Sequence, residues 1–75
     1  MYITVKCFAT LKQFQPENEE HFPLLPGETA GDVVGRLGIA PDEVAVLFVN
    51  GAHAPLDRAL SDGDRLSLFP AVGGG

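Results

Sequence analysis

The residues with the clearest chemical use lie at the end of the sequence. It closes on Gly73-Gly74-Gly75, and Gly75 supplies a carboxylate next to a carbon that bears no side chain. Three consecutive glycines lose much backbone freedom when they are ordered, so they contribute little to folding. A carboxylate at the tip of such a strip is unhindered on both faces. We therefore expect the tail to serve chemistry, with the Gly75 carboxylate as the reacting group.

A second reactive group, Cys7, has a pattern that favours a structural role. Cys7 alternates with Ile3 and Val5 on the apolar side of the first segment, while the basic Lys6 falls on the opposite side. A reactive cysteine needs a cationic neighbour and access to solvent. The sequence therefore predicts a buried, small apolar residue at Cys7. Because it is the one cysteine in the chain, no intramolecular disulfide can form.

Neither the histidines nor the paired aspartates predict a metal site. His21 has no partner at the spacing of metal ligands. Asp62 and Asp64 flank Gly63, but the ligand pattern of a calcium loop does not follow them. A tight turn before a last strand is the favoured interpretation.

Composition limits the class of protein. Seventy-five residues allow one domain, and 45% hydrophobic content excludes a disordered polar segment. Ten acidic residues against five basic ones give a net charge of −5, which argues against nucleic-acid binding. We expect either a basic protein surface as partner or a charge that serves only solubility. With neither a signal peptide nor an apolar run of membrane-spanning length, the expected location is the cytoplasm.

The first third of the chain predicts two strands. Residues 1–9 alternate between apolar and polar positions, as a strand with one buried face does. Residues 10–20 are a polar connection in which Leu11 and Phe14 are spaced to cover one end of the core. Residues 21–25 predict an antiparallel edge strand, because Pro23 cannot donate a ladder hydrogen bond.

A helix is predicted after the turn Pro26-Gly27-Glu28. Thr29 can cap it together with Asp32, three residues later, and Gly38 is suited to its end. Gly31 and Gly35 cost helix stability, and we expect them to permit close packing on the sheet. The apolar stripe recurs at helical spacing and comprises Ala30, Val33, Val34 and Leu37.

The remaining segments predict a hairpin and a last strand. Residues 44–49 are an unbroken apolar run followed by Asn50-Gly51, the strongest short-range hairpin signal, and by a short return strand at residues 53–54. After the Asp62-Gly63-Asp64 turn, residues 65–69 alternate as a strand. Pro70 is expected to end that strand and to direct the tail away from it.

Together these elements predict an α+β domain with four to five strands in a sheet and one helix on one face. The predicted core comprises Ile3, Val5, Cys7, Phe22, Leu24, Leu47, Leu66 and Leu68 of the sheet, facing the helix stripe. The opposite face then carries Phe8, Phe48 and Phe69, and an exposed apolar patch usually marks a protein interface. The alternative is a different strand register, with one or two of these phenylalanines in the core.

At the level of motifs, the whole chain resembles the ubiquitin-like β-grasp sulfur carriers, which are the small subunit of molybdopterin synthase and the thiamine-pathway carrier. The resemblance rests on Pro26-Gly27-Glu28-Thr29 leading into the helix, Val49-Asn50-Gly51, and Asp62-Gly63-Asp64 leading through Phe69-Pro70 to the glycines. It implies a mixed sheet, a β-grasp domain over residues 1–69 and a flexible tail over residues 70–75. Phe69-Pro70 resembles the molybdopterin branch more than the thiamine branch, whereas Gly73 departs from the usual pattern.

The resemblance implies a function for the tail. An adenylating enzyme related to the ubiquitin activators would transfer AMP from ATP to Gly75, and a sulfur donor would convert the adenylate into a thiocarboxylate. The large subunit of molybdopterin synthase, or an equivalent, would then accept the sulfur for a molybdenum or tungsten cofactor. The chain would bind no cofactor itself and act as co-substrate or non-catalytic subunit. The residues expected to enter the partner's active site are Pro70, Ala71, Val72, Gly73 and Gly74, with Phe8, Phe48 and Phe69 as the docking patch.

Three alternatives remain open at this point. The chain could be a protein modifier whose Gly75 is joined to a lysine of a target. It could be the sulfur carrier of the thiamine pathway. It could also be a β-grasp interaction module with an inert tail, in which case removing Gly74 and Gly75 would leave its function intact.

Overall fold

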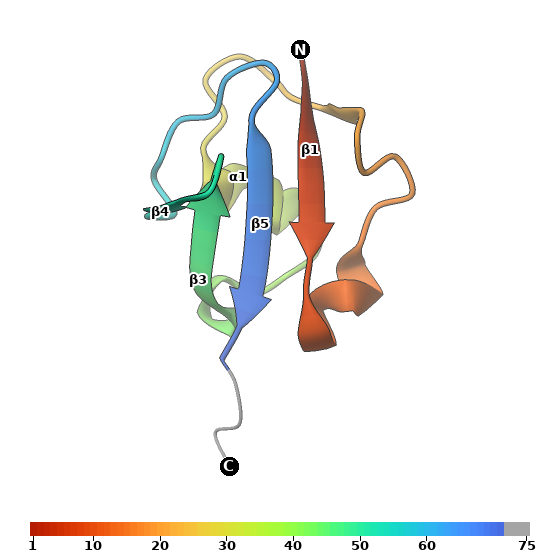
Figure 1. Ribbon diagram of the computed structural model, residues 1–75, viewed down its shortest axis with the longest axis vertical. Coiled ribbons are helices and arrows are strands. Elements are labelled where there is room, and N and C mark those ends of the chain that lie inside the picture. Colours follow the sequence, from red (N-terminus) through yellow and green to blue (C-terminus); the bar gives the residue numbers. More distant parts are fainter. Residues whose placement is uncertain (72–75) are drawn as a thin grey trace.

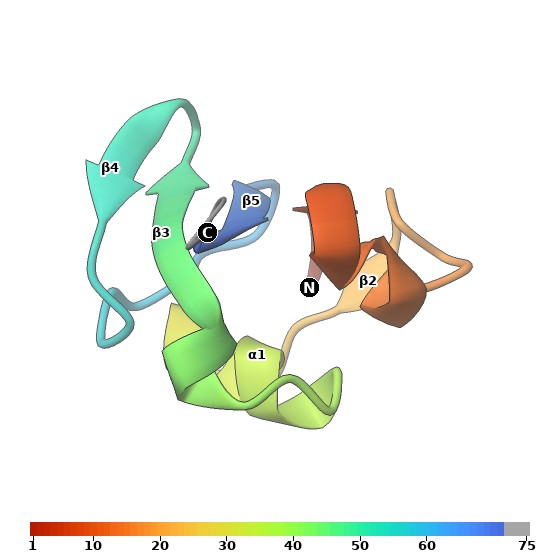
Figure 2. The ribbon, with the colours of Figure 1, turned by 90° about the horizontal axis from the view of Figure 1, so that it is seen from below.

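Five strands form one mixed sheet, and α1 packs across one of its faces (Figures 1 and 2). The structure is a computed structural model that describes residues 1–71. The strand order is β2-β1-β5-β3-β4, with β1 and β5 parallel and all other neighbours antiparallel. The predicted α+β architecture is therefore confirmed. The elements are β1 (Tyr2–Cys7), η1 (Ala9–Phe14), β2 (Phe22–Pro23), α1 (Ala30–Arg36), η2 (Pro41–Glu43), β3 (Val44–Val49), β4 (Ala52–Ala54) and β5 (Arg65–Pro70).

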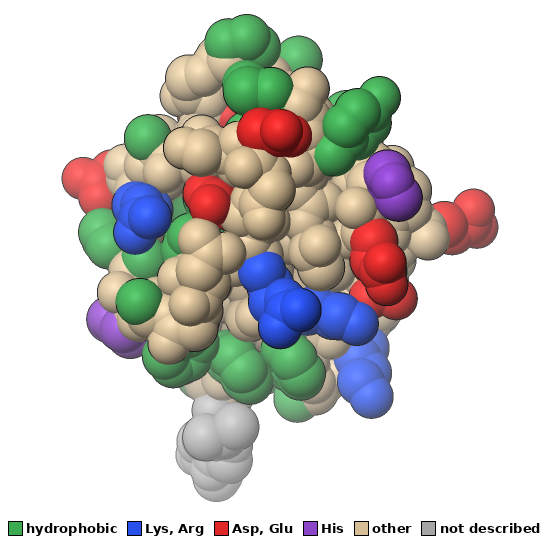
Figure 3. Space-filling view, turned by 45° about the horizontal axis from the view of Figure 1, so that its top comes forward, with side chains coloured by type: hydrophobic (Ala, Val, Ile, Leu, Met, Phe, Trp, Pro, Cys, Tyr) green, Lys and Arg blue, Asp and Glu red, His purple; other side chains and the backbone are tan. Residues whose placement is uncertain are grey.

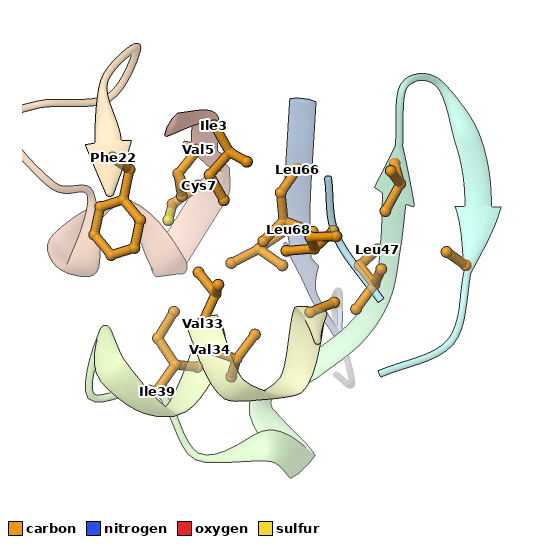
Figure 4. Packing of buried hydrophobic residues seen from close by; sticks show 14 of the residues in the cluster. Ile3, Val5, Cys7, Phe22, Val33, Val34, Ile39, Leu47, Leu66 and Leu68 are labelled. Atoms are coloured by element: carbon orange, nitrogen blue, oxygen red, sulfur yellow. The ribbon is translucent and has the colours of Figure 1, made fainter. Parts of the chain in front are cut away.

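The core lies between α1 and the sheet face that α1 covers (Figure 4). Strand residues alternate between this face and the opposite one, as the alternating sequence predicts. Val5, Leu66 and Leu68 are fully buried. The predicted register is confirmed, because every sheet residue expected in the core is buried there. These residues are Ile3, Val5, Cys7, Phe22, Leu24, Leu47, Leu66 and Leu68.

Helix α1 begins at the predicted cap. The backbone N–H of Asp32 donates to the Thr29 hydroxyl (3.2 Å), and the backbone N–H of Thr29 donates to the Asp32 carboxylate (2.9 Å). This reciprocal pair satisfies two donors that the first helical turn leaves free. Three stripe residues, Ala30, Val33 and Val34, are fully buried, and Leu37 is partly buried at the C-terminal cap.

The turn at Asn50-Gly51 and the turn at Asp62-Gly63-Asp64 are joined by hydrogen bonds at the end of the sheet where β5 begins. Asn50 (φ 54°) and Gly51 (φ 82°) adopt the left-handed conformation that a two-residue hairpin requires. The Asn50 side chain donates to Asp64 (2.9 Å) and accepts from the backbone N–H of Arg65 (2.9 Å). Asp64 also accepts from the backbone N–H of Ser61 (2.8 Å). Its carboxylate thus joins two turns, and no metal-binding cluster of acidic, histidine or cysteine side chains occurs within residues 1–71.

The backbone hydrogen-bonding groups on the outer edge of β1 have partners that the sequence did not predict. Strand β2 pairs with only Tyr2 and Ile3 of β1. Beyond them, the Gln15 side chain accepts from the backbone N–H of Cys7 (2.7 Å) and donates to the carbonyl of Val5 (2.8 Å). The backbone N–H of Val5 donates to the carbonyl of Glu19 (2.7 Å), so the Gln15 amide and this carbonyl together take the place of a neighbouring strand.

Several expectations on element bounds were wrong. The edge strand is two residues long instead of covering residues 21–25. Leu24 follows it, and its backbone N–H donates to the carbonyl of Met1 (2.8 Å), the residue opposite it in the same register. The connection after β1 contains the 3₁₀ helix η1, which buries Leu11 as expected. Gly31 does permit close approach, but to the backbone of Leu56 instead of the sheet, while a Cβ on Gly35 would meet nothing within 4 Å. No helix of residues 1–71 is long and apolar enough to span a membrane.

Candidate functional site

The site predicted from the sequence consists of the chain end and an aromatic patch, and the structure describes the patch and the start of the tail. Val72, Gly73, Gly74 and Gly75 lie outside the described residues. Strand β5 includes Pro70, so the assignment of Pro70 to the tail was wrong. Pro70 is buried opposite Val44 of β3, and its missing N–H is tolerated at the end of the ladder. Ala71, the next residue, is exposed.

The three predicted phenylalanines form one cluster on the open face, which is the face of the sheet opposite α1. The rings of Phe8 and Phe69 are stacked, with centroids 4.5 Å apart and planes 3° apart. The ring of Phe48 meets that of Phe69 edge to face at 5.6 Å. Both geometries are favourable for aromatic pairs. We call this group the aromatic cluster.

Strand register brings the aromatic cluster together from three segments. Phe48 and Phe69 lie on antiparallel neighbours, at positions whose parity points away from α1. Phe8 follows β1, and its backbone N–H donates to the carbonyl of Leu68 (3.0 Å), which extends the pairing with β5 by one residue. Its side chain therefore meets Phe69 across the two parallel strands.

Packing within the cluster reduces its exposure. Phe8 remains 37% exposed, but Phe48 and Phe69 are half-buried by each other and by their neighbours. The cluster is consequently a shaped surface, and its rings are already held in one arrangement.

Two members of this surface were missed from the sequence. Val46 is paired with Phe69 in the register of β3 and β5 and therefore shares its face. His53 of β4 meets the ring of Phe48 edge to face at 5.9 Å. Val46 lies two residues before Phe48 and shares its face by strand alternation. The β-bulge between Val44 and Val46 instead changes the pairing of Val44, which lies opposite Pro70, and a bulge has no clear signal in an unbroken apolar run.

Cys7 precedes Phe8 in the chain, but its surroundings do not favour reactivity. Its side chain is on the core face of β1 and 4% of the residue is exposed. Burial raises the pKa of the Cys7 thiol above its usual value of 9.0, because the thiolate would lose its hydration. The predicted structural role of Cys7 is therefore supported by its surroundings.

A shallow depression of about 400 Å³ adjoins the cluster at the outer side of β1. Its lining includes Lys6 of β1, Phe8 immediately after β1, and Lys12 of η1. The Lys6 ammonium pairs with the Glu19 carboxylate at its border (2.7 Å). The open face thus combines aromatic rings with basic side chains.

Comparison with known proteins agrees with this architecture. A family model described as the ThiS family matches residues 5–75. The structure of SAMP1 from Haloferax volcanii is similar with 28% identity and a TM-score of 0.68, covering 97% of this chain and 98% of that one.

Two further solved structures have comparable similarity. A putative molybdopterin converting factor, subunit 1, from Pyrococcus furiosus is 26% identical with a TM-score of 0.69, covering 93% of this chain and 97% of that one. A structure of H. volcanii small archaeal modifier protein 1 is 26% identical with a TM-score of 0.70 and the same two coverages. The predicted ubiquitin-like β-grasp fold is confirmed by these matches.

Proposed function

The chain belongs to the ThiS family of ubiquitin-like β-grasp sulfur carriers, and we propose that it carries sulfur on Gly75 for the synthesis of a molybdopterin cofactor. The observation that carries the proposal is the continuity between the aromatic cluster and the chain end. Phe69 belongs to the cluster, Pro70 ends β5, and Ala71 already leaves the buried domain. A partner that holds the cluster would also hold the start of the tail.

The proposed chemistry has two steps. The Gly75 carboxylate attacks the α-phosphorus of ATP in an adenylating enzyme, which forms an acyl-adenylate and releases pyrophosphate. Hydrosulfide, or a sulfur donor that delivers it, then attacks the acyl carbon and expels AMP, which leaves a thiocarboxylate. The adenylate is shielded from water while the tail is inside the enzyme.

The reach of the tail fits this role. Five residues from Ala71 to Gly75 span at most about 17 Å when extended. The three terminal glycines present no side chains, so they can thread a narrow channel and adopt left-handed conformations where the channel requires them.

The choice of the molybdopterin branch rests on one relative. The Pyrococcus furiosus structure is described as a putative molybdopterin converting factor subunit. By this analogy the acceptor of the sulfur is a larger synthase subunit. The cytoplasm is the compartment in which we place the reaction.

The decisive experiment is activation of the purified chain. Incubation with the adenylating enzyme of the same organism, ATP and sulfide should replace one oxygen of the C-terminus by sulfur, as seen by intact-mass spectrometry. A variant that lacks Gly74 and Gly75 is the control and should not react. If the full chain yields neither the adenylate nor the thiocarboxylate, the proposal is wrong.

A second candidate function is modification of proteins. It is favoured by the similarity to two structures described as SAMP1 and as small archaeal modifier protein 1. In that case Gly75 would form an isopeptide bond with a lysine of a target. Tagged full-length chain should then produce adducts of higher mass in cells, and these should disappear from cells that express the variant without Gly74 and Gly75.

A further inference from the structure

The charge of this chain is divided unequally between its loops and its sheet. The whole sequence has ten acidic residues and five basic ones. No residue of the five strands described in residues 1–71 is acidic, because every Asp and Glu lies in a helix, a turn or a loop. The strands do contain Lys6 and Arg65.

Both basic strand residues point away from α1. Lys6 is paired with Ser67, and Arg65 is paired with Thr4, in the parallel ladder of β1 and β5. These four positions alternate with core residues, so they lie on the open face. Lys6 is two residues from Phe8, and Arg65 is four residues from Phe69. At strand spacing these separations are roughly 7 Å and 13 Å.

A third basic side chain joins them from outside the sheet. Lys12 of η1 lines the depression that Lys6 and Phe8 also line. In Figure 3 basic side chains gather on this side of the molecule directly above the hydrophobic side chains at its lower edge. Acidic side chains lie above this group and to its sides in the same view, and one acidic group adjoins it.

Two of the three basic groups form no ion pair within the described residues. Lys6 pairs with Glu19, but within residues 1–71 no carboxylate lies within 4 Å of the charged groups of Lys12 and Arg65. The screening length at physiological salt is about 8 Å, so a docked surface is sensitive to these local charges more than to the net charge.

We infer that the open face docks on a protein surface that has an apolar centre and Asp or Glu carboxylates beside it. This inference rests on the proposed function, since it takes the adenylating enzyme as the partner. The aromatic cluster supplies the apolar contact, and Lys12 and Arg65 meet the carboxylates. The expectation of a basic partner, which followed from the net charge, is reversed for this face.

Charge reversal tests the inference with a matched control. Arg65→Glu and Lys12→Glu should each weaken the dissociation constant for the adenylating enzyme, measured by calorimetry with the full chain, by about tenfold or more. Arg58→Glu makes the same change in net charge. Arg58 lies in the loop next to α1, where its carbonyl accepts from the backbone N–H of Ala30, so this variant should bind within about threefold of the unmodified chain.

The outcomes separate docking from chemistry. Equal effects of the three reversals, tighter binding by Arg65→Glu, or no binding by the unmodified chain would overturn the inference. ATP–pyrophosphate exchange, measured in parallel, reports on Gly75 activation alone. If the unmodified chain supported no exchange while Arg65→Glu still weakened binding, the proposed function would be wrong and the inferred docking surface would stand. If circular dichroism shows that Arg65→Glu does not fold, Lys12→Glu and Arg65→Gln replace it in the binding test. Arg65→Gln should then weaken binding by a smaller but measurable factor.

Discussion

At the scale of single residues, Cys7 is the side chain whose environment changes its chemistry most clearly. Its thiol lies on the core face of β1, and burial raises its pKa above 9.0. The folded chain therefore keeps the thiol proton at a pH at which the unfolded chain has lost it. The stability due to this difference is complete below the unfolded pKa and declines as the pH rises through the folded one.

We predict that the free energy of unfolding falls above pH 9 by up to about 1.4 kcal/mol per pH unit more in the natural chain than in Cys7→Ala. Urea unfolding of both proteins between about pH 7 and pH 10.5 measures the difference. Other titrating groups cancel in the comparison. Parallel curves for the two proteins would show that the thiol titrates alike in both states.

Phe69 is the residue that the aromatic cluster depends on, because its ring contacts both Phe8 and Phe48. We predict that Phe69→Asp weakens partner binding at least about tenfold, as loss of a central aromatic anchor does. The domain should still fold, with a loss of roughly 1–3 kcal/mol from the two ring contacts.

The control for Phe69 is Leu25→Asp, which places the same group at an exposed apolar residue between β2 and α1. Its effect on binding to the adenylating enzyme should be small. Calorimetry measures binding, and thermal unfolding measures the fold. If Leu25→Asp weakened binding as much as Phe69→Asp, the docking surface would have to extend beyond the open face.

At the scale of elements, Gln15 replaces a strand beside β1. Its side chain makes hydrogen bonds of 2.7 Å and 2.8 Å with the backbone of Cys7 and Val5. We predict that Gln15→Ala lowers the free energy of unfolding by about 1–3 kcal/mol, because two backbone groups lose their partners. It should also increase self-association, since an unpaired strand edge is a template for pairing.

The matched control is Gln13→Ala, whose side chain makes one exposed hydrogen bond of 3.2 Å to the carbonyl of Thr10. Urea unfolding gives the stability of both variants, and analytical ultracentrifugation gives their association. Equal stability of the two variants would mean that other groups can satisfy the edge of β1.

Local signals predicted most of the elements correctly. Asn50-Gly51 gave the hairpin because only left-handed residues fit its turn, and Thr29 with Asp32 gave the start of α1 because their reciprocal hydrogen bonds span three residues. The period-two pattern predicted the buried faces of β1 and β5. Each of these signals is contained within a few neighbouring residues.

The missed features depend on contacts between distant segments. From the sequence alone Gln15 is an ordinary loop residue, because its hydrogen bonds to the backbone of Val5 and Cys7 become evident only in the folded chain. Pro70 reads as a strand terminator until Val44 is found opposite it. At the site, strand alternation predicted the aromatic cluster and is also sufficient to place Val46, but the contact of His53 with Phe48 depends on the pairing of β3 with β4.

At the scale of the whole molecule, folding and chemistry are assigned to different parts of the chain. The described core is built from residues between Ile3 and Leu68, whereas the proposed reacting group is Gly75. We predict that a chain ending at Ala71 keeps its melting temperature within about 2 °C, a shift well under 1 kcal/mol for a domain of this size. The same truncation should abolish adenylation.

Differential scanning calorimetry of the two chains tests this separation. Gly75→Ala, which keeps the length of the chain, is the control for effects of truncation alone. A fall in melting temperature of more than about 5 °C would show that residues 72–75 contribute to the stability of the fold, and the proposed division into domain and tail would be wrong.

The position of β5 has a mechanical consequence. This strand lies in the middle of the sheet and is hydrogen-bonded to β1 on one side and to β3 on the other. Ala71 continues directly from it, so tension applied to the chain end acts lengthwise on β5. Such tension loads the bonds of both ladders together, in shear, instead of opening them one after another. Under the proposed function, the domain is therefore a firm anchor, and the adenylating enzyme would draw the tail into its cleft without separating β5 from the sheet.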